Sequence, residues 1–316
     1  MLIRNCQPAD AAQEAIVYNV AAARLPGFRP VSTEQARRVA SARANESSSR
    51  ICAEVDGRLV GYVSFEPNGR VNYPWCLPGH EKLAHHLFGT VLRTLGDRKV
   101  ARAYAACRGD WAEQVEFFKD HGFVKVRDIV NFTQSIADLP TMFQRPGLNI
   151  TLFKPDDLPE IERFVPSLPR LNGAVLADYF DDASAYPRDA AFVLRRKDNQ
   201  IQGVGILIDD ESFASVDSLD PRMPNSWLGA FGTDGFAIKR VNGMFSFLAP
   251  PGKDAVVTAQ DLLWYGTSRM ETNSFEFVAA QAPSDVPHLL SFYERYFEKQ
   301  GSFPVFERDL ATTTET

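Results

Sequence analysis

Hydrophobic and polar positions divide the first half of the chain into short, clearly bounded elements. Apolar and polar residues alternate over 50–55 and 58–65, and Asp56-Gly57 between these runs is a strong hairpin signal. Helical spacing follows Asp10 to about residue 23 and Ser32 to about residue 45, and both residues are favourable N-caps. The pattern then predicts a strand at 70–77, a helix at 81–95, a strand at 100–106, a helix at 111–120 and strands to about 136.

The second half repeats this pattern. Ile3, Pro8 and Asp10 recur 147 positions later, and the hairpin 56–61 recurs 142 positions later, as 198–203. Residues after the hairpin recur 175 positions later, for example Ala84 as Ala259. The larger offset predicts about 33 extra residues in the second copy, within 209–242. This segment contains Trp227 and is rich in Pro and Gly, so it is either a lid or interface element or a surface elaboration.

A repeat of about 150 residues is typical of a tandem domain duplication rather than of a solenoid. We predict a first domain at 1–138, a linker at 139–149, a second domain at 150–310 and a disordered tail at 311–316. The predicted fold class is α/β, with α+β character: each domain has a central mixed β-sheet flanked by helices.

Composition restricts the possible functions. The chain has 316 residues and a formal net charge of −6, which argues against a general nucleic-acid binder because phosphate contacts need clustered Lys and Arg. The four cysteines are scattered without a CxxC pair, so we expect reduced thiols. The first residues lack the apolar core of a signal peptide, and no apolar run is long enough to cross a bilayer. We therefore expect a cytoplasmic protein that binds neither nucleic acid nor membrane.

The stretch CLPGHEKLAHHLF, residues 76–88, holds a cluster of potential metal ligands: His80, Glu81, His85 and His86. It differs from the zinc motif H-E-x-x-H by one residue. Positions i and i+4 lie about 40° apart around a helix, whereas i and i+5 lie about 140° apart, so His80 and His85 face different sides. The spacing supplies no third ligand, and we predict no metal site here. The cluster is therefore interpreted as the polar face of a helix. The buried stripe of that helix is Leu83, Leu87, Val91 and Leu95.

Three motifs and their order resemble the GNAT superfamily of N-acyltransferases. They are V-D-G-R-L-V-G-Y-V at 55–63, the strand exit Leu77-Pro78 into a helix, and F-F-K-D-H-G-F at 117–123. The last motif is similar to the family signature F-Y-x-x-x-G-F, and F-Y-E-R-Y-F at 292–297 corresponds to it in the second half. The whole chain thus resembles two GNAT domains in tandem.

The resemblance implies that acetyl-CoA, or another acyl-CoA, is the co-substrate and that no metal takes part. The family binds the pyrophosphate on a Q/R-x-x-G-x-G/A loop, where free N–H groups and the helix dipole favour an anion. Backbone groups at the strand exits would face the thioester carbonyl. The implied cofactor-binding residues are Leu77, Gly79, His80, Lys82 and Ala84 in the first copy and Leu248, Gly252 and Lys253 in the second.

Both loops depart from the family pattern. In the first copy Gly79 replaces the Arg or Gln, and Lys82 replaces a glycine. In the second copy Asp254 replaces the Arg or Gln, where it is a natural N-cap and would repel a pyrophosphate, and Val257 replaces the glycine. The first loop is the more favourable of the two for binding an anion, because His80 and Lys82 can carry positive charge.

The family's general acid, a tyrosine that protonates the leaving thiolate, falls on Tyr293 in the second copy and on Phe118 in the first, which cannot donate a proton. Without the resemblance, Tyr293 is a half-buried core aromatic. Glu66, at the end of a hairpin strand, is either a base acting through water or a solvated carboxylate.

The resemblance implies an N-acyltransferase, with acetyl-CoA as the expected donor, that acts on a small-molecule amine. The alternative is a catalytically inactive GNAT pair that serves as a small-molecule or protein binding module. Whether the chain forms a homodimer is left open.

Overall fold

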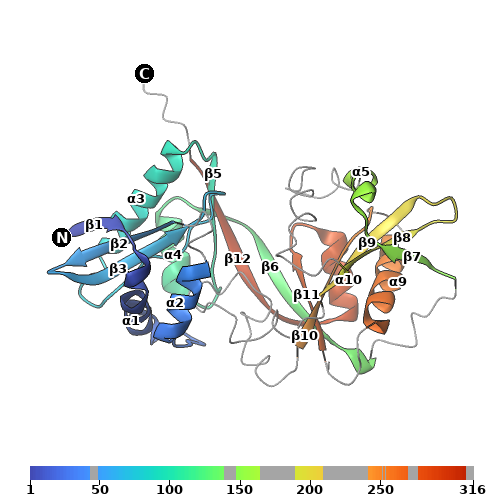
Figure 1. Cartoon of the computed structure of the whole chain (residues 1–316), viewed down its shortest axis with the longest axis horizontal. Helices are drawn as coiled ribbons and strands as arrows, with labels where there is room; N and C mark the ends of the chain where they lie inside the picture. Colours follow the sequence, from blue (N-terminus) through green and yellow to red (C-terminus); the bar gives the residue numbers. More distant parts are fainter. Residues whose placement is uncertain are drawn as a thin grey trace. The chain divides into compact units, whose positions relative to one another are not determined.

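The computed structural model describes residues 1–42, 49–138, 147–163, 189–208, 241–250, 252, 254–269 and 277–310. The chain divides into two compact units (Figure 1). Of the described residues, unit 1 contains 1–127 and 303–310, and unit 2 contains 128–302. The predicted insertion at 209–242, apart from its last two residues, and the predicted tail lie outside the described residues, as does most of the predicted linker.

Unit 1 follows the predicted order of elements. Its strands and helices are β1 (Leu2–Asn5), η1 (Pro8–Asp10), α1 (Ala11–Ala22), α2 (Thr33–Ala42), β2 (Ser49–Val55), β3 (Arg58–Phe65), β4 (Trp75–Cys76), α3 (Leu83–Asp97), β5 (Arg102–Ala106) and α4 (Ala112–Asp120). The hairpin β2–β3 is confirmed, with Asp56 and Gly57 both at positive φ, as its tight turn requires. The Ser32 hydroxyl accepts the Gln35 N–H at 3.0 Å, so Ser32 caps α2 as predicted.

The strands of unit 1 form the sheet β1-β2-β3-β4 (Figure 1). Alternation along its hairpin gives this sheet two apolar faces. One face packs against α1 and α2 through a cluster that includes Tyr18, Cys52 and Trp75. The other packs against α3 and α4, where the predicted stripe of α3 is buried at Leu87, Val91 and Leu95 and half-buried at Leu83. Period-2 alternation in the strands and a helical stripe on each side are therefore enough to build a three-layer unit.

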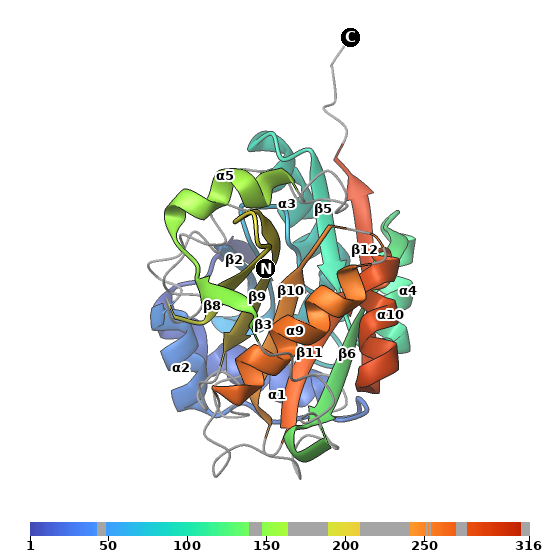
Figure 2. The ribbon, with the colours of Figure 1, turned by 90° about the vertical axis from the view of Figure 1, so that its right-hand side faces the viewer.

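Unit 2 is a mixed sheet with helices packed on it (Figures 1 and 2). Its elements are β6 (Val124–Ser135), η2 (Ile136–Asp138), β7 (Asn149–Leu152), η3 (Pro155–Asp157), α5 (Leu158–Ile161), β8 (Ala191–Arg195), β9 (Ile201–Ile208), β10 (Val241–Leu248), α9 (Ala255–Ser268), β11 (Phe277–Pro283), α10 (Pro287–Tyr296) and β12 (Glu298–Asp309). The strand order is β6-β11-β10-β9-β8-β7, with β10 and β11 parallel and the other pairs antiparallel. Helix α9 contacts β9 and β10, and α10 contacts β11. None of the described helices combines the length and the apolar character that a membrane-crossing helix needs.

The internal repeat recurs as matching contacts in the two units. Asp10 and Asp157 each accept the backbone N–H three residues earlier and form an ion pair with an arginine. Gln13 and Glu160, which are 147 positions apart, each use their side-chain oxygen to accept an N–H from the second strand of the hairpin, at 3.0 and 2.9 Å. In each unit, therefore, an equivalent side-chain hydrogen bond connects the first helical turn to the hairpin.

In each unit, two parallel strands part after a short paired stretch. In unit 1 the Val71 N–H donates to the Tyr104 carbonyl and the Tyr104 N–H donates to the Gly69 carbonyl, each at 2.9 Å. The chain then leaves β5 and joins β3 at β4, so the strand predicted over 70–77 is regular only at Trp75–Cys76. In unit 2, β10 and β11 pair only as far as Met244 and Ala279. Beyond that point β10 pairs with β9, and β11 with β6.

The final strand, β12, has residues in both units, as β6 does. Its residues from Phe303 onward belong to unit 1, where Val305–Asp309 pair antiparallel with β5. The predicted boundaries place this segment in the second domain, whereas the contacts group it with the first.

Candidate functional site

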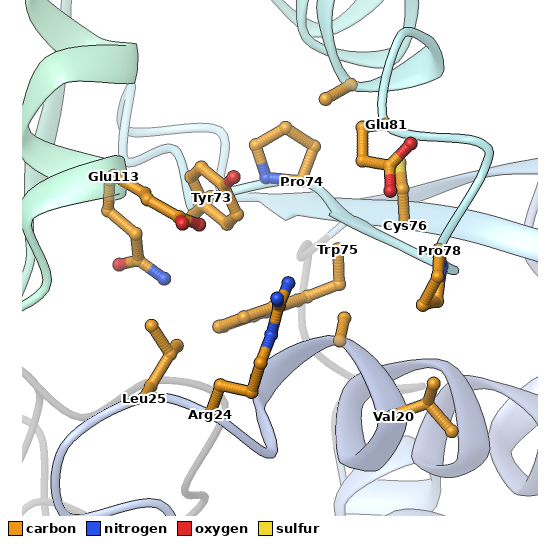
Figure 3. Close-up of a pocket in the computed structure, with 13 residues that line it drawn as sticks. Val20, Arg24, Leu25, Tyr73, Pro74, Trp75, Cys76, Pro78, Glu81 and Glu113 are labelled. Atoms are coloured by element: carbon orange, nitrogen blue, oxygen red, sulfur yellow. The ribbon is translucent and has the colours of Figure 1, made fainter.

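A cavity of about 290 Å³ opens in unit 1, and the segment that follows the departure from β5 forms part of its lining (Figure 3). Its walls come from the end of α1, from the segment 73–78, and from the starts of α3 and α4. The lining residues are Val20, Ala21, Arg24, Leu25, Tyr73, Pro74, Trp75, Cys76, Pro78, Glu81, Ala84, Glu113 and Gln114. The volume lies at the lower end of the range for small-molecule sites.

Aromatic rings form the rigid part of this cavity. Tyr73 packs edge-on against Trp75 and Phe117, with ring centroids 5.2 and 5.1 Å away. Trp75 is buried and also packs edge-on against Tyr18 and Trp111. Edge-to-face contacts at these distances fix the orientation of the rings, so the wall is preformed.

The polar groups of the cavity are a phenol, a thiol, an amide and three charged side chains. Burial, together with the nearby Glu113 carboxylate, raises the pKa of Tyr73 to about 12, so its hydroxyl keeps its proton at neutral pH. Burial also raises the pKa of the Cys76 thiol to about 12, so it is not a thiolate. Arg24, Glu81 and Glu113 line the cavity and are exposed to solvent.

At the start of α3, a backbone N–H binds a carboxylate of the same turn. Gly79, at φ +86, donates its N–H to Glu81 Oε1 at 2.9 Å, and this hydrogen bond lowers the pKa of the Glu81 carboxyl. A Cβ on Gly79 would meet nothing within 4 Å, so the turn is open. Its geometry fits an anionic oxygen, and the exposed Glu81 side chain competes for it.

The candidate residues of the first copy are distributed around this cavity. Ala84 lines it, while Gly79, His80 and Lys82 form the adjoining turn, with Lys82 at the N-cap of α3. The Leu77 N–H donates to the Val60 carbonyl at 2.8 Å in the strand ladder, and the roles of these residues in acyl-CoA binding stay predictions.

In unit 2 a second cavity, of about 270 Å³, lies at the start of α9. Gly252 lines it, whereas Leu248 is not among its lining residues and Lys253 lies outside the described residues. Asp254 stands at the N-cap but makes no side-chain capping hydrogen bond, which corrects the predicted cap; its carboxylate lies 3.8 Å from the Arg196 guanidinium. Both partners are exposed, so this ion pair contributes little stability.

The two predicted catalytic side chains lie outside both cavities. Tyr293 is 1% exposed, packs among the core aromatics of unit 2, and donates its hydroxyl to the Phe245 carbonyl at 3.3 Å. Phe245 is the first β10 residue beyond the paired stretch with β11, so this hydroxyl lies where those strands part. Glu66 is part of a turn, where Asn68 donates to it at 3.2 Å and Arg70 lies 3.7 Å away. Both catalytic roles stay predictions.

The histidines of the stretch 76–88 include His85 and His86, which lie exposed on α3 as part of its polar surface. The His85 ring stacks on His121, with Nδ1 of His85 3.2 Å from Nε2 of His121. His121 Nδ1 lies 2.7 Å from the Phe117 carbonyl, and burial lowers the pKa of His121. Within the described residues, Cys6, Asp10 and Cys52 form the one group with metal-ligating potential, with ligand atoms within 4.8 Å of one another. Arg4 donates two hydrogen bonds to the Asp10 carboxylate, so a cation there would meet a bound guanidinium.

Sequence reasoning missed the residues that make the unit 1 cavity polar: Arg24, Tyr73, Glu113 and Gln114. A signal existed for Gln114. Helical spacing puts it on the same face as Phe117 and Phe118, so an amide stands at a core position of α4. Arg24 and Tyr73 give no comparable signal, because both look like ordinary surface or strand residues.

Comparison with known proteins identifies the fold. No protein family model matches the chain, and no curated protein matches it. A GCN5-related N-acetyltransferase from Sphaerobacter thermophilus is 14% identical with a TM-score of 0.63, over 98% of this chain and 95% of that one. A tandem GNAT protein from the clavulanic acid biosynthesis pathway is 10% identical with a TM-score of 0.59, over 98% of both chains.

A GCN5-related glucosamine N-acetyltransferase region of a fungal multi-domain GH3 beta-N-acetylglucosaminidase has a TM-score of 0.68 at 11% identity. This match covers 97% of the present chain and 38% of the fungal one. Identities this low establish shape rather than chemistry. The chain thus has the mixed α/β fold of the GCN5-related N-acetyltransferases, in the tandem arrangement.

Proposed function

We propose that the chain is an N-acyltransferase that uses an acyl-CoA, with acetyl-CoA as the expected donor, and that the transfer takes place in the unit 1 cavity. The observation that carries this proposal is the position of the cavity. It is lined by the segment that follows the departure from β5, it adjoins the turn at the start of α3, and its lining includes the protonated Tyr73 phenol and the Glu113 carboxylate. The acceptor is a small-molecule amine.

An acyl-CoA would supply the acyl group as an activated thioester. The start of α3 would bind its phosphates through the Gly79 N–H and the Lys82 side chain once Glu81 moves aside, which an exposed side chain can do. The preformed wall of Trp75 and Pro74 excludes water from one side of the reacting groups.

In this proposal one residue accepts a proton from the amine and a second stabilises the leaving thiolate. The Glu113 carboxylate accepts the proton that the amine loses as it attacks. Tyr73 Oη donates a hydrogen bond to the sulfur that leaves. A phenol with a pKa of about 12 is a weak acid, so Tyr73 stabilises the developing thiolate charge rather than protonating it fully. This assignment is an alternative to the predicted acid Tyr293, which is buried and lines neither of the two cavities described above.

The test is release of free thiol from acetyl-CoA in the presence of a panel of small amines. We expect Tyr73→Phe to lower kcat about tenfold to a hundredfold and to leave the fold intact. Tyr104→Phe is the matched control, because Tyr104 is another half-buried tyrosine of unit 1 that does not line the cavity. If instead Tyr293→Phe abolishes turnover and Tyr73→Phe does not, the transfer site is in unit 2.

One observation favours the alternative of an inactive binding module: Glu81 already accepts the Gly79 N–H that a phosphate would need. A protein that turns over no amine and gains no thermal stability from millimolar acetyl-CoA would establish that alternative, because a ligand of the folded state must stabilise it.

A further inference from the structure

The unit 1 cavity contains a buried hydrogen-bond donor without a partner. Gln114, on α4, is 3% exposed and lines the cavity. Within the described part of the chain, its Nε2 has no hydrogen-bond partner. A buried amide N–H left unpaired is unfavourable, and most such groups in folded proteins are satisfied. This donor therefore points to a ligand with an acceptor oxygen.

A guanidinium enters the same cavity. Figure 3 shows the Arg24 side chain reaching from the end of α1 toward the middle of the pocket. Among the described lining residues it is the one cation. The loop that follows Arg24 is anchored, because the indole N–H of Trp111 donates to the Pro26 carbonyl at 2.9 Å. The Trp111 ring is itself covered by the Arg108 guanidinium. Arg24 therefore lies in the lining of the cavity. Among the described residues it forms no ion pair.

Two carboxylates lie on either side of this guanidinium. In Figure 3, Glu113 lies beside Tyr73 at one end of the cavity, and Glu81 lies above Pro78 at the other. The cavity therefore offers donors for an anionic group and acceptors for a cationic group within one small volume. Between them the wall of Trp75, Pro74 and Val20 is apolar.

We propose that this cavity binds a small zwitterion, an amine that also carries a carboxylate, as α-amino acids do. Arg24 and Gln114 donate to the carboxylate, and Glu113 and Glu81 attract the ammonium group. The apolar wall contacts the remainder of the molecule. The proposal rests on the proposed function only in making the zwitterion the acyl acceptor; binding itself needs no acyl-CoA.

Isothermal titration calorimetry on the full chain, without acyl-CoA, tests the ligand class. The probes are L-leucine, L-methionine and L-phenylalanine, each compared with its decarboxylated amine and its deaminated acid. We expect at least one amino acid to bind about tenfold or more tighter than its two partial analogues, because each analogue leaves one charged group of the cavity unmatched. Equal binding of amine and amino acid, or binding of none of the amino acids, overturns the proposal.

Two substitutions test the residues. Arg24→Gln is expected to weaken amino-acid binding about tenfold and to leave binding of the matched amine unchanged. Gln114→Met is expected to weaken it severalfold while the melting temperature stays the same or rises, because an unpaired buried donor is removed. A merely structural glutamine would instead lower the melting temperature on substitution. Arg37→Gln, an exposed arginine of α2 away from the cavity, is the control and should change neither property. Wild-type affinity in both Arg24→Gln and Gln114→Met refutes the assignment.

The outcomes separate this inference from the proposed function. Amino-acid binding without acyl transfer leaves the zwitterion site standing and removes the enzyme. Acyl transfer to simple amines without amino-acid binding supports the enzyme and removes the zwitterion site.

Discussion

Gly69 lets the chain approach the backbone of β5 closely, and Gly69→Ala tests that contact. At this residue the chain runs against β5, before it departs toward β4. Its φ is +96, and an added Cβ would collide with the Arg102 carbonyl oxygen on β5. Its own carbonyl accepts the Tyr104 N–H, and two residues later Val71 returns a hydrogen bond to Tyr104.

The expected loss of stability has two parts. Alanine at positive φ costs about 1–2 kcal/mol. The collision with backbone cannot relax by rotating a side chain, so the two strands must separate and give up two hydrogen bonds of about 0.5–1.5 kcal/mol each. The total is about 2–5 kcal/mol, measured as the free energy of unfolding in guanidinium with tryptophan fluorescence as the probe.

Gly57→Ala provides the matched control. Gly57 also has a positive φ, +75, but an added Cβ there meets nothing within 4 Å. It should therefore cost only the backbone strain, about 1–2 kcal/mol. If the two variants agree within about 0.5 kcal/mol, the strand contact at Gly69 contributes nothing and the reasoning is refuted.

Three further results are expected. Glu81→Gln should raise acetyl-CoA affinity severalfold in a titration, because it removes a carboxylate that competes for the Gly79 N–H; weaker binding would show that Glu81 assists the ligand. Asp10→Asn should flatten the acid dependence of stability. The Arg4 hydrogen bonds lower the folded pKa of Asp10, so its contribution is present above the unfolded value of about 3.9 and is lost as pH falls through the folded pKa. Parallel acid-unfolding curves for the wild type and Asp10→Asn would contradict this. Phe306→Ala should cost about 3–5 kcal/mol, because this side chain is 1% exposed in the core of unit 1; a cost below about 1 kcal/mol in denaturant unfolding would show that the strand is peripheral.

The elements that local chemistry determines could be predicted from the sequence. The hairpin around Asp56-Gly57 and the capped start at Ser32 depend on residues next to one another, and both are found where the pattern places them. Offsets between Asp10 and Asp157 identified the duplication, because each copy needs the same local hydrogen bonds.

The strand pairing and the polar groups of the cavity could not be predicted in the same way. Which edge the last strand joins depends on contacts about 200 residues apart, such as Arg102 with Glu307, and alternation along a strand does not specify a partner. The cavity combines Arg24, Tyr73 and Gln114 from three elements, and nothing in their spacing links them. Only Gln114 stands out in the sequence, as an amide on an apolar helix face.

The origin of β12 has a consequence for folding during synthesis. Unit 1 is built mainly from residues 1–127, yet its strand β5 pairs with Val305–Asp309, a segment about 200 residues further along the chain. The N-terminal half is synthesised first, with this edge of β5 unpaired and with Phe118 lacking its stacking partner Phe306. Closing a loop of this length is entropically costly and slow, so unit 1 is completed only after β12 has been synthesised. Until then the bare edge of β5 is a surface that chaperones must shield or that a neighbouring chain can occupy.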